Sequence, residues 1–379
     1  MENKRINFME KFKFNVDEVL AKLALNVGIV PTKPTMPIFS KVWIKKRGEE
    51  VSLTTSDGEM WLTMPGIGVS GDPQEINLCL NANDFYKALS NLKGEVVEIV
   101  CDGERKSVVC KYTNGEFTLP CDVGDEFPLP SPIEDKEQKT ILLDGEVLYK
   151  GLRGVEYAMG DDALRPVLSG ARLDFTQEGL FIVATNGHKL TQYKDTNNKM
   201  DIPWGLTLPK KTSTLLKSIL QDSKVGFTMG NGILRIEGEG YTITTRLLEG
   251  AYPNYRGVIP NETPNHMTIK RERILQALKR MSLFAKVIRL KIGAHEVVMD
   301  VENLDMSTSA HEVIPCAYDG EALEIGFNGE YLLEVISNID GENIVMHLIS
   351  PNKPCVFTPQ EGEENIEHKA VLTPMVLKR

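Results

Sequence analysis

The alternation of hydrophobic and polar residues along this chain changes period at regular points. Segments such as "FKFNV" and "INLCLN" alternate apolar and polar positions, as strands with one buried face do. Each runs into a stretch such as "DEVLAKLAL", whose apolar residues recur at helical spacing. Short alternating segments bounded by Gly, Asp and Asn follow each helical stretch. The pattern therefore predicts units of one strand, one helix and three strands.

This unit recurs along the chain at a spacing close to one domain. Strand-then-helix segments form two interleaved sets, which start at Phe12, Thr140 and His266 and at Ile76, Trp204 and Leu323. Within each set the spacing is roughly 120 to 130 residues. We therefore predict an α+β fold of three repeated domains, each of two β-α-β-β-β halves with antiparallel sheets. Pro-rich polar segments at 126–138 and 252–265 place the domains at 1–133, 134–262 and 263–379.

Composition narrows the class of protein. With 379 residues and 41% hydrophobic content, the chain can fill several cores. No stretch approaches the roughly 18 apolar residues of a membrane span, and the N-terminus lacks the pattern of a secretion signal, so we expect a cytoplasmic protein. The net charge of −10 argues against coating nucleic acid by bulk charge, although it permits a local basic surface.

The motifs of catalysis and cofactor binding are weak in this sequence. "GIGVSG" (66–71) fits a dinucleotide-binding pattern, but "EINLCLN" after it alternates like a strand and offers no helix N-terminus. The six cysteines form no CxxC pair and are expected to be buried free thiols, and no two histidines have the helical spacing of a metal site. We expect no cofactor, no metal ion and no catalytic residue. A further alternative, a hydrolase with an unrecognised site, is supported by no set of residues in the sequence.

Four motifs, together with the repeats, resemble one known family. They are "ATNGHKL" (184–190), "EGAYPNYRGVIP" (249–260), "GEALEIGFNGEYLLEVI" (320–336) and "VLTPMVL" (371–377). In this order they resemble the beta subunit of bacterial DNA polymerase III, the sliding clamp, from about Phe12 to Leu377. The resemblance implies the DNA clamp fold, with antiparallel sheets outside and helices lining a ring, and a non-catalytic role as a processivity factor of DNA replication.

The resemblance also implies the partners. A head-to-tail homodimer would encircle duplex DNA without sequence preference, slide along it at the nucleoid, and tether the replicative polymerase, the clamp loader and other proteins with a clamp-binding motif. Geometry favours two subunits. Twelve helices about 9 to 10 Å apart enclose a hole of roughly 27 Å, enough for a duplex, whereas six leave only about 8 Å. An alternative is a protein-binding scaffold of the same fold that does not encircle DNA, favoured by the acidic balance and the acidic segment 328–340.

Residue by residue, the resemblance assigns a groove for a short Gln/Leu/Phe-containing peptide tail. Its residues are Leu168, Thr185, Gly187, His188, Lys189, Leu190, Pro253, Val258, Tyr331, Val371, Pro374, Met375 and Leu377. In this interpretation His188 is a wall of a docking site rather than a catalytic base or metal ligand. Gly257 and Val376 stand where the family often has Arg, and Thr373 where it often has Met, which leaves the peptide preference open.

Two further sets follow from the resemblance. Phosphate contacts that do not read bases are assigned to Lys33, Arg165, Lys210 and Lys211. Asp162 replaces an uncharged residue near Arg165, so this loop is expected to contact DNA differently. The subunit interface is assigned to Phe117 and Leu119 of one subunit and Leu283 and Phe284 of the other. For these apolar residues, and for Leu168 and Val258, ordinary core is the plainer alternative.

Overall fold

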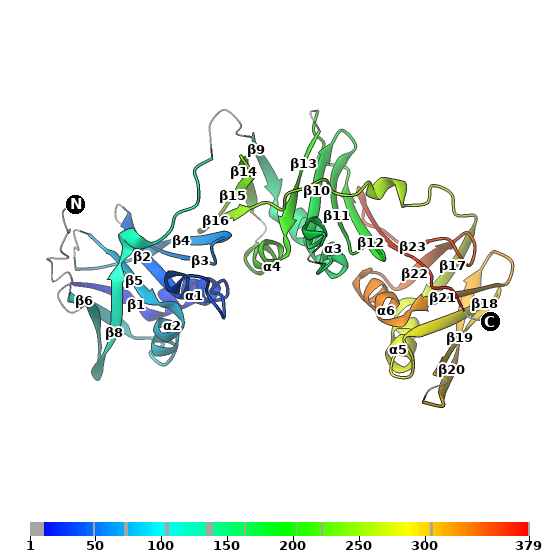
Figure 1. The fold of residues 1–379 in the computed structure, drawn as a ribbon, viewed down its shortest axis with the longest axis horizontal. Coiled ribbons are helices and arrows are strands. Elements are labelled where there is room, and N and C mark those ends of the chain that lie inside the picture. The colour runs from blue at the N-terminus through cyan, green and yellow to red at the C-terminus, as the bar shows by residue number, and fades with distance from the viewer. Residues whose placement is uncertain are drawn as a thin grey trace. The chain divides into compact units, whose positions relative to one another are not determined.

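The predicted unit of strand, helix and three strands recurs throughout the computed structural model (Figure 1). The structure describes residues 11–47, 50–71, 75–102, 106–133, 139–162, 164–201, 203–220, 223–303 and 306–377. Within these residues every α-helix follows directly on a strand. The pairs are β1 (Lys11–Asn15) with α1 (Val16–Val27), β5 (Asn77–Asn81) with α2 (Ala82–Ser90), β9 (Lys139–Asp144) with α3 (Gly145–Val155), β13 (Trp204–Pro209) with α4 (Lys210–Ile219), β17 (Asn265–Lys270) with α5 (Arg271–Met281), and β21 (Leu323–Asn328) with α6 (Gly329–Asn338).

Three strands follow each helix, which confirms the predicted α+β repeat. They are β2 (Lys41–Arg47), β3 (Glu50–Ser56) and β4 (Met60–Gly68); β6 (Val96–Asp102), β7 (Ser107–Tyr112) and β8 (Gly115–Val123); β10 (Gly170–Thr176), β11 (Gly179–Thr185) and β12 (Lys189–Asp195); β14 (Lys224–Gly230), β15 (Ile233–Gly238) and β16 (Tyr241–Arg246); β18 (Val287–Ile292), β19 (Glu296–Asn303) and β20 (Thr308–Tyr318); and β22 (Asn343–Leu348), β23 (Cys355–Pro359) and β24 (Ile366–Leu372). We call each group of one strand, one helix and three strands a repeat. The last strands of the repeats are β4, β8, β12, β16, β20 and β24.

Side-chain caps explain where most of these helices begin. Asn15 Oδ1 accepts a hydrogen bond from the Asp17 N–H at 2.9 Å, which satisfies a first-turn donor that has no partner inside the helix. Asn81, Asp144 and Asn328 cap α2, α3 and α6 in the same way. Helices α4 and α5 begin without a side-chain cap. The polar residue that closes a strand therefore often starts the next helix.

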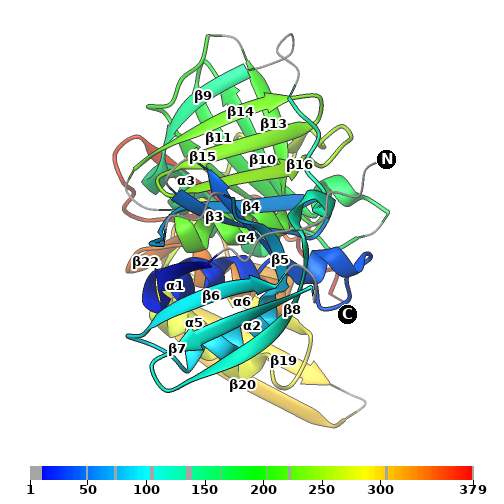
Figure 2. The ribbon, with the colours of Figure 1, turned by 90° about the vertical axis from the view of Figure 1, so that its left-hand side faces the viewer.

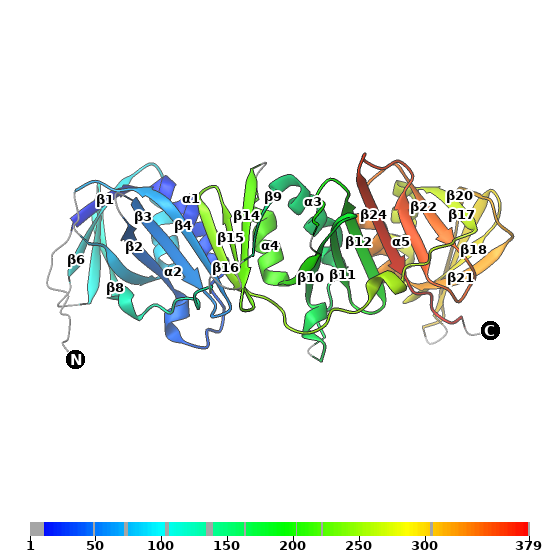
Figure 3. The ribbon, with the colours of Figure 1, turned by 90° about the horizontal axis from the view of Figure 1, so that it is seen from above.

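The chain divides into two compact units, residues 1–143 with 223–246 and residues 144–222 with 247–379. The described strands of unit 1 form one sheet in the order β1-β6-β7-β8-β5-β2-β3-β4-β16-β15-β14-β9 (Figure 2). Those of unit 2 form another in the order β13-β10-β11-β12-β24-β23-β22-β17-β20-β19-β18-β21, in which Figure 3 shows β24 (dark red) beside β12. The helices pack in neighbouring pairs, α1 with α2, α3 with α4, and α5 with α6.

Apolar helix faces build the cores of these units. Leu23 of α1 and Phe85 of α2 belong to one buried cluster of unit 1, and Leu278 of α5 and Ile336 of α6 belong to one of unit 2. All six cysteines are free thiols as expected; Cys79, Cys110, Cys121 and Cys355 are buried, whereas Cys101 and Cys316 are only partly so. In the part of the chain that the structure describes, no helix is long and apolar enough to cross a membrane.

The last strands of different repeats pair with one another. In unit 1, β4 pairs with β16, and in unit 2, β12 pairs with β24. The other two last strands have no such partner among the described residues. Strand β8 pairs with β7 at residues 115–120 and with β5 only at residues 121–123. Strand β20 pairs with β19 at residues 308–315 and with β17 only at residues 316–318. Among the described strands, residues 115–120 and 308–315 thus each have one strand neighbour and one open edge.

Candidate functional site

The Asn186–Gly187 turn joins β11 to β12 and holds His188 at the surface. Asn186 Oδ1 accepts the N–H groups of His188 and Lys189 at 2.9 and 3.0 Å, and Gly187 has a φ of 89°, which glycine adopts readily. The Thr185 hydroxyl donates to the Lys189 carbonyl at 2.8 Å and accepts the Gly187 N–H at 3.1 Å. Thr185 and Gly187 therefore shape the turn, while His188 is the side chain that it displays.

The segment after β24 passes beside this turn. The Thr373 N–H donates to the His188 carbonyl at 3.1 Å, and the Met375 N–H donates to the Gly326 carbonyl of β21 at 2.8 Å. Gly326 has no side chain, and a Cβ there would lie only 2.5 Å from Leu377 Cδ2, so Leu377 packs on bare backbone. The C-terminal segment thus contacts the turn at His188 and strand β21 at Gly326.

An apolar cluster lies on one face of the β12 and β24 strands. Leu190 and Val371 are directly opposite each other in register. Both belong to a cluster that includes Tyr255, with Tyr252 packed against it, from the segment after β16. Val258 of the same segment is 50% exposed. We call this set, with the exposed Pro253, His188 and Met375, the candidate groove, its buried apolar residues the floor and its exposed residues the rim.

The side chains of two predicted groove residues lie outside this apolar cluster. Lys189 and Leu190 are neighbours on β12, so their side chains point to opposite faces of the sheet. The Lys189 ammonium lies on the helix side, where it forms an ion pair with Glu334 of α6. Leu168 is 2% exposed in the short helix η5 (Pro166–Leu168), and within the described residues it is not a member of the apolar cluster. Neither side chain contributes to the exposed rim.

Tyr331 lies between these two regions. Its ring stacks on that of His188, with centroids 5.9 Å apart and an interplanar angle of 24°. The Lys189 Nζ lies 5.0 Å from the centroid of the same ring. Tyr331 therefore contacts both the displayed histidine and the buried lysine.

The basic residues predicted to face DNA are accessible, and Arg165 and Lys210 each form an ion pair with an aspartate. Arg165 Nε lies 3.0 Å from Asp162 Oδ2, and Lys210 Nζ lies 3.2 Å from Asp161 Oδ1. The Leu164 N–H and then Arg165 hold the pKa of Asp162 below its usual value, so this carboxylate stays charged. Exposed pairs of this kind are weak, and phosphates can displace them.

The remaining predicted DNA residues lie in both units. Lys211 is exposed in the first turn of α4 in unit 2. Lys33 is exposed in unit 1, in the segment between α1 and the short helix η1 (Pro37–Ser40). Both positions suit contacts with phosphate through a long flexible side chain.

The predicted interface residues lie beside the open strand edges. Phe117 and Leu119 of β8 are partly buried against the core of unit 1. Leu283 is 81% exposed and Phe284 is 39% exposed, directly after α5. This end of α5 lies against β20, because Arg280 binds Glu312 through two hydrogen bonds of 2.7 Å.

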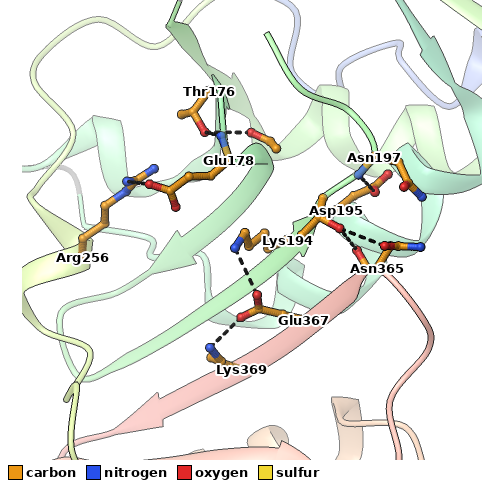
Figure 4. Close-up of polar contacts among 11 residues, drawn as sticks. Thr176, Glu178, Lys194, Asp195, Asn197, Arg256, Asn365, Glu367 and Lys369 are labelled. Carbon is orange, nitrogen blue, oxygen red and sulfur yellow. Dashed lines mark hydrogen bonds and ion pairs between the residues drawn. The ribbon is translucent and has the colours of Figure 1, made fainter. Parts of the chain in front are cut away.

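A row of charges on the outer face of β12 and β24 was missed by the sequence reasoning (Figure 4). Glu367 accepts from Lys194 at 3.0 Å and from Lys369 at 2.7 Å, and Lys369 and then Lys194 lower the pKa of Glu367. Arg256 pairs with Glu178 at 3.6 Å and lies 4.4 Å from the ring centroid of Phe181. Alternation on two paired strands could have shown that Lys194 and Glu367 share a face, but only once the pairing was known.

Comparison with known proteins agrees with this geometry. Family models of the DNA polymerase III beta subunit match residues 10–131 as its N-terminal domain, 142–254 as its central domain and 256–375 as its C-terminal domain. The chain belongs to the DNA polymerase III beta subunit family. The resemblance found in the sequence is thereby confirmed. Members of this family are the sliding clamps of DNA replication, and the role of this chain is that of a clamp and processivity factor.

Individual relatives support the same assignment. The chain is 26% identical to the beta sliding clamp of Synechococcus elongatus over 359 residues, which covers 90% of this chain and 94% of the relative. It is also 26% identical to that of Pseudomonas putida, with 97% and 100% covered. Its fold is that of the sliding clamp from Pseudomonas aeruginosa bound to griselimycin, with a TM-score of 0.89, 24% identity and 98% and 100% covered. The scaffold alternative is not favoured by these matches.

Proposed function

We propose that two copies of this chain associate head to tail and close a ring around duplex DNA. The observation that carries the proposal is the pairing of last strands. Four of them pair with the last strand of another repeat, and among the described strands β8 and β20 are left with open edges. Pairing β8 of one copy with β20 of the next would repeat the same contact between subunits and cover both edges.

The interface proposal is tested with a charge at Leu283. Because Leu283 is 81% exposed, Leu283→Asp should leave the fold intact while burying a carboxylate in the proposed interface. We expect the mass in solution at micromolar concentration to fall from a dimer to a monomer. Leu142→Asp is the matched control, since Leu142 is also exposed, at 68%, and lies outside the proposed interface. A wild-type monomer, or a Leu283→Asp dimer, contradicts the proposal.

Encirclement has its own test. The protein is loaded onto nicked circular DNA with a clamp loader and ATP, and the circle is then cut. A ring held only by topology slides off the free ends, so rapid loss on linear DNA is expected, whereas equal retention on circles and linear DNA overturns encirclement.

Replacing Lys210 and Lys211 by Gln tests the proposed phosphate contacts. In a plot of the logarithm of the DNA-binding constant against the logarithm of salt concentration, the slope should become shallower by about 0.9 for each lost contact.

We further propose that the candidate groove anchors peptide tails of the polymerase, the clamp loader and other partners, in the cytoplasm at the nucleoid. Its buried apolar floor and exposed rim suit an extended peptide with apolar anchors. The bound polymerase, rather than this chain, would supply the chemistry. The test is His188→Ala combined with removal of residues 374–379: peptide affinity should fall while the dimer mass stays unchanged. Unaltered affinity refutes the groove.

A further inference from the structure

Lys189 is a charged side chain in a buried position. Its side chain is 4% exposed, on the face of β12 that meets the helices. An ammonium group removed from water is tolerated only where a counter-charge and polar contacts replace its hydration. Glu334 of α6 supplies the counter-charge, and its carboxylate is 37% exposed. The ion pair thus ties the first residue of β12 to the middle of α6.

Two aromatic rings enclose the same ammonium. Its Nζ lies 5.0 Å from the ring centroid of Tyr331 and 5.5 Å from that of Tyr157, distances at which a cation is attracted to a ring face. The Tyr157 hydroxyl is hydrogen-bonded to Thr191, and burial raises the pKa of Tyr157, so this ring stays neutral. The cation therefore has a defined position relative to both rings. We call Lys189, Glu334, Tyr157 and Tyr331 the Lys189 cluster.

The side chains of the Lys189 cluster contact the candidate groove through the ring of Tyr331. Tyr331 stacks on His188, which is exposed at the end of its turn. The cluster also borders a cavity of about 670 Å³, which Asn186 and Lys210 line together with the four residues of the cluster. The contacts form a continuous chain from Glu334 through Lys189 and Tyr331 to His188.

We propose that Lys189 is a positioning residue of the candidate groove. It does not touch the peptide; it fixes Tyr331, and through that ring it holds His188 in the orientation that receives the peptide. The inference rests on the proposed peptide-binding function of the groove. It predicts that the charge of Lys189 affects peptide affinity although its ammonium lies on the opposite face of the sheet.

The first test removes the charge and keeps the length of the side chain. Lys189→Met should weaken binding of a Gln/Leu/Phe-containing peptide, measured by fluorescence anisotropy with the full dimer, by about 3- to 10-fold, the equivalent of one lost ring contact. Lys189→Arg keeps a cation that can pair with Glu334 and should restore the affinity to within about twofold. Lys217→Met is the control, because Lys217 forms a comparable ion pair with Glu156 in the same unit. Equal affinity of Lys189→Met and wild type overturns the proposal.

A double-mutant cycle tests the route through His188. In a His188→Ala background, Lys189→Met should cost no further affinity, since the ring that it positions is gone. Additive losses would mean that Lys189 acts on the peptide by another route, and they would overturn the proposal. The ring-proton shifts of His188 in NMR spectra should also move toward those of an unstacked histidine in Lys189→Met, and unchanged shifts count against the inference.

Two outcomes separate this inference from the groove itself. If His188→Ala with removal of residues 374–379 leaves peptide affinity unchanged, the groove assignment fails. If that variant binds weakly but Lys189→Met binds normally, only the positioning role fails. Should Lys189→Met disturb folding because Glu334 is left without its cation, the pair Lys189→Met and Glu334→Gln removes both charges, and the same loss of affinity is expected from it.

Discussion

The two strand pairs that join repeats within the chain, β4–β16 and β12–β24, share a topology and differ in chemistry. The β4–β16 pair has four registered positions, Thr242 to Thr245 opposite Thr63 to Met60, and every side chain is uncharged. The β12–β24 pair has seven, from Lys189 opposite Leu372 to Asp195 opposite Ile366. One pair therefore does little more than continue a sheet. The other adds a buried cation, a charged row and an apolar cluster, and the candidate groove lies there.

The comparison suggests that function in this fold is added to a contact rather than built by it. Both pairs satisfy the hydrogen bonds of backbone N–H and C=O groups through an antiparallel ladder, so either could join two repeats. Only β12–β24 displays a turn with an exposed ring at one end, at His188, and receives the C-terminal segment beside it. Matched substitutions in the two pairs can test this distinction.

The largest expected effect comes from truncating one buried leucine in each pair. Leu62 of β4 and Leu190 of β12 are both buried, and either change to Ala should cost about 2 to 5 kcal/mol of unfolding free energy. Only Leu190→Ala should also weaken peptide binding, because Leu190 belongs to the apolar cluster. Thermal unfolding and peptide titration of both variants check this. A Leu62→Ala protein that loses peptide affinity as strongly would erase the distinction.

Acidification should separate the pairs next. All six histidines belong to unit 2, and burial lowers the pKa of His368 on β24 from its ordinary 6.5. The hydrogen bond to the Gly154 carbonyl and then the charge of Asp340 oppose this shift, whereas Arg153 adds to it. The unfolded chain then binds more protons than the folded one, so stability present above pH 6.5 is lost as the pH falls toward the folded pKa. Hydrogen exchange at pH 7 and 5.5, corrected for intrinsic rates, should show β24 opening more readily in acid while β16 is unaffected. Equal changes in both strands would contradict this origin.

The smallest effect is expected from the charged row. Glu367→Gln should lower the unfolding free energy by a few tenths to about 1 kcal/mol, because its two lysine partners lie partly in solvent. The loss should nearly vanish in 1 M salt, where the screening length is about 3 Å. Denaturant unfolding at low and high salt measures it. A loss that persists in high salt would assign Glu367 a role other than charge pairing.

Hydrophobic periodicity predicted most of the fold, because the helices and strands of the repeat differ in the spacing of their apolar residues. The Asn186–Gly187 turn could also be predicted, since the positive φ that favours glycine is a local requirement. The face of Lys189 was not, because the side on which a strand residue lies depends on register, and one residue of shift reverses it. Its partner Glu334 lies on a helix far along the chain, and no local pattern in the sequence links the two. Resemblance placed both Lys189 and Leu190 in the groove, whereas in the structure only Leu190 packs in its apolar floor.

The open edges of β8 and β20 also bear on synthesis of the chain. β8 ends at Val123 and β20 begins at Thr308, so at about 5 to 20 residues per second the first edge waits roughly 10 to 40 s on the ribosome before the second exists. During that interval any neighbouring nascent chain with a bare strand is a competitor. Each edge carries a glutamate and a proline, Glu116 with Pro120 and Glu312 with Pro315, and such residues discourage indiscriminate strand addition. These residues would thus discourage β8 and β20, the edges proposed to close the ring, from pairing with strands of other nascent chains on the same polysome.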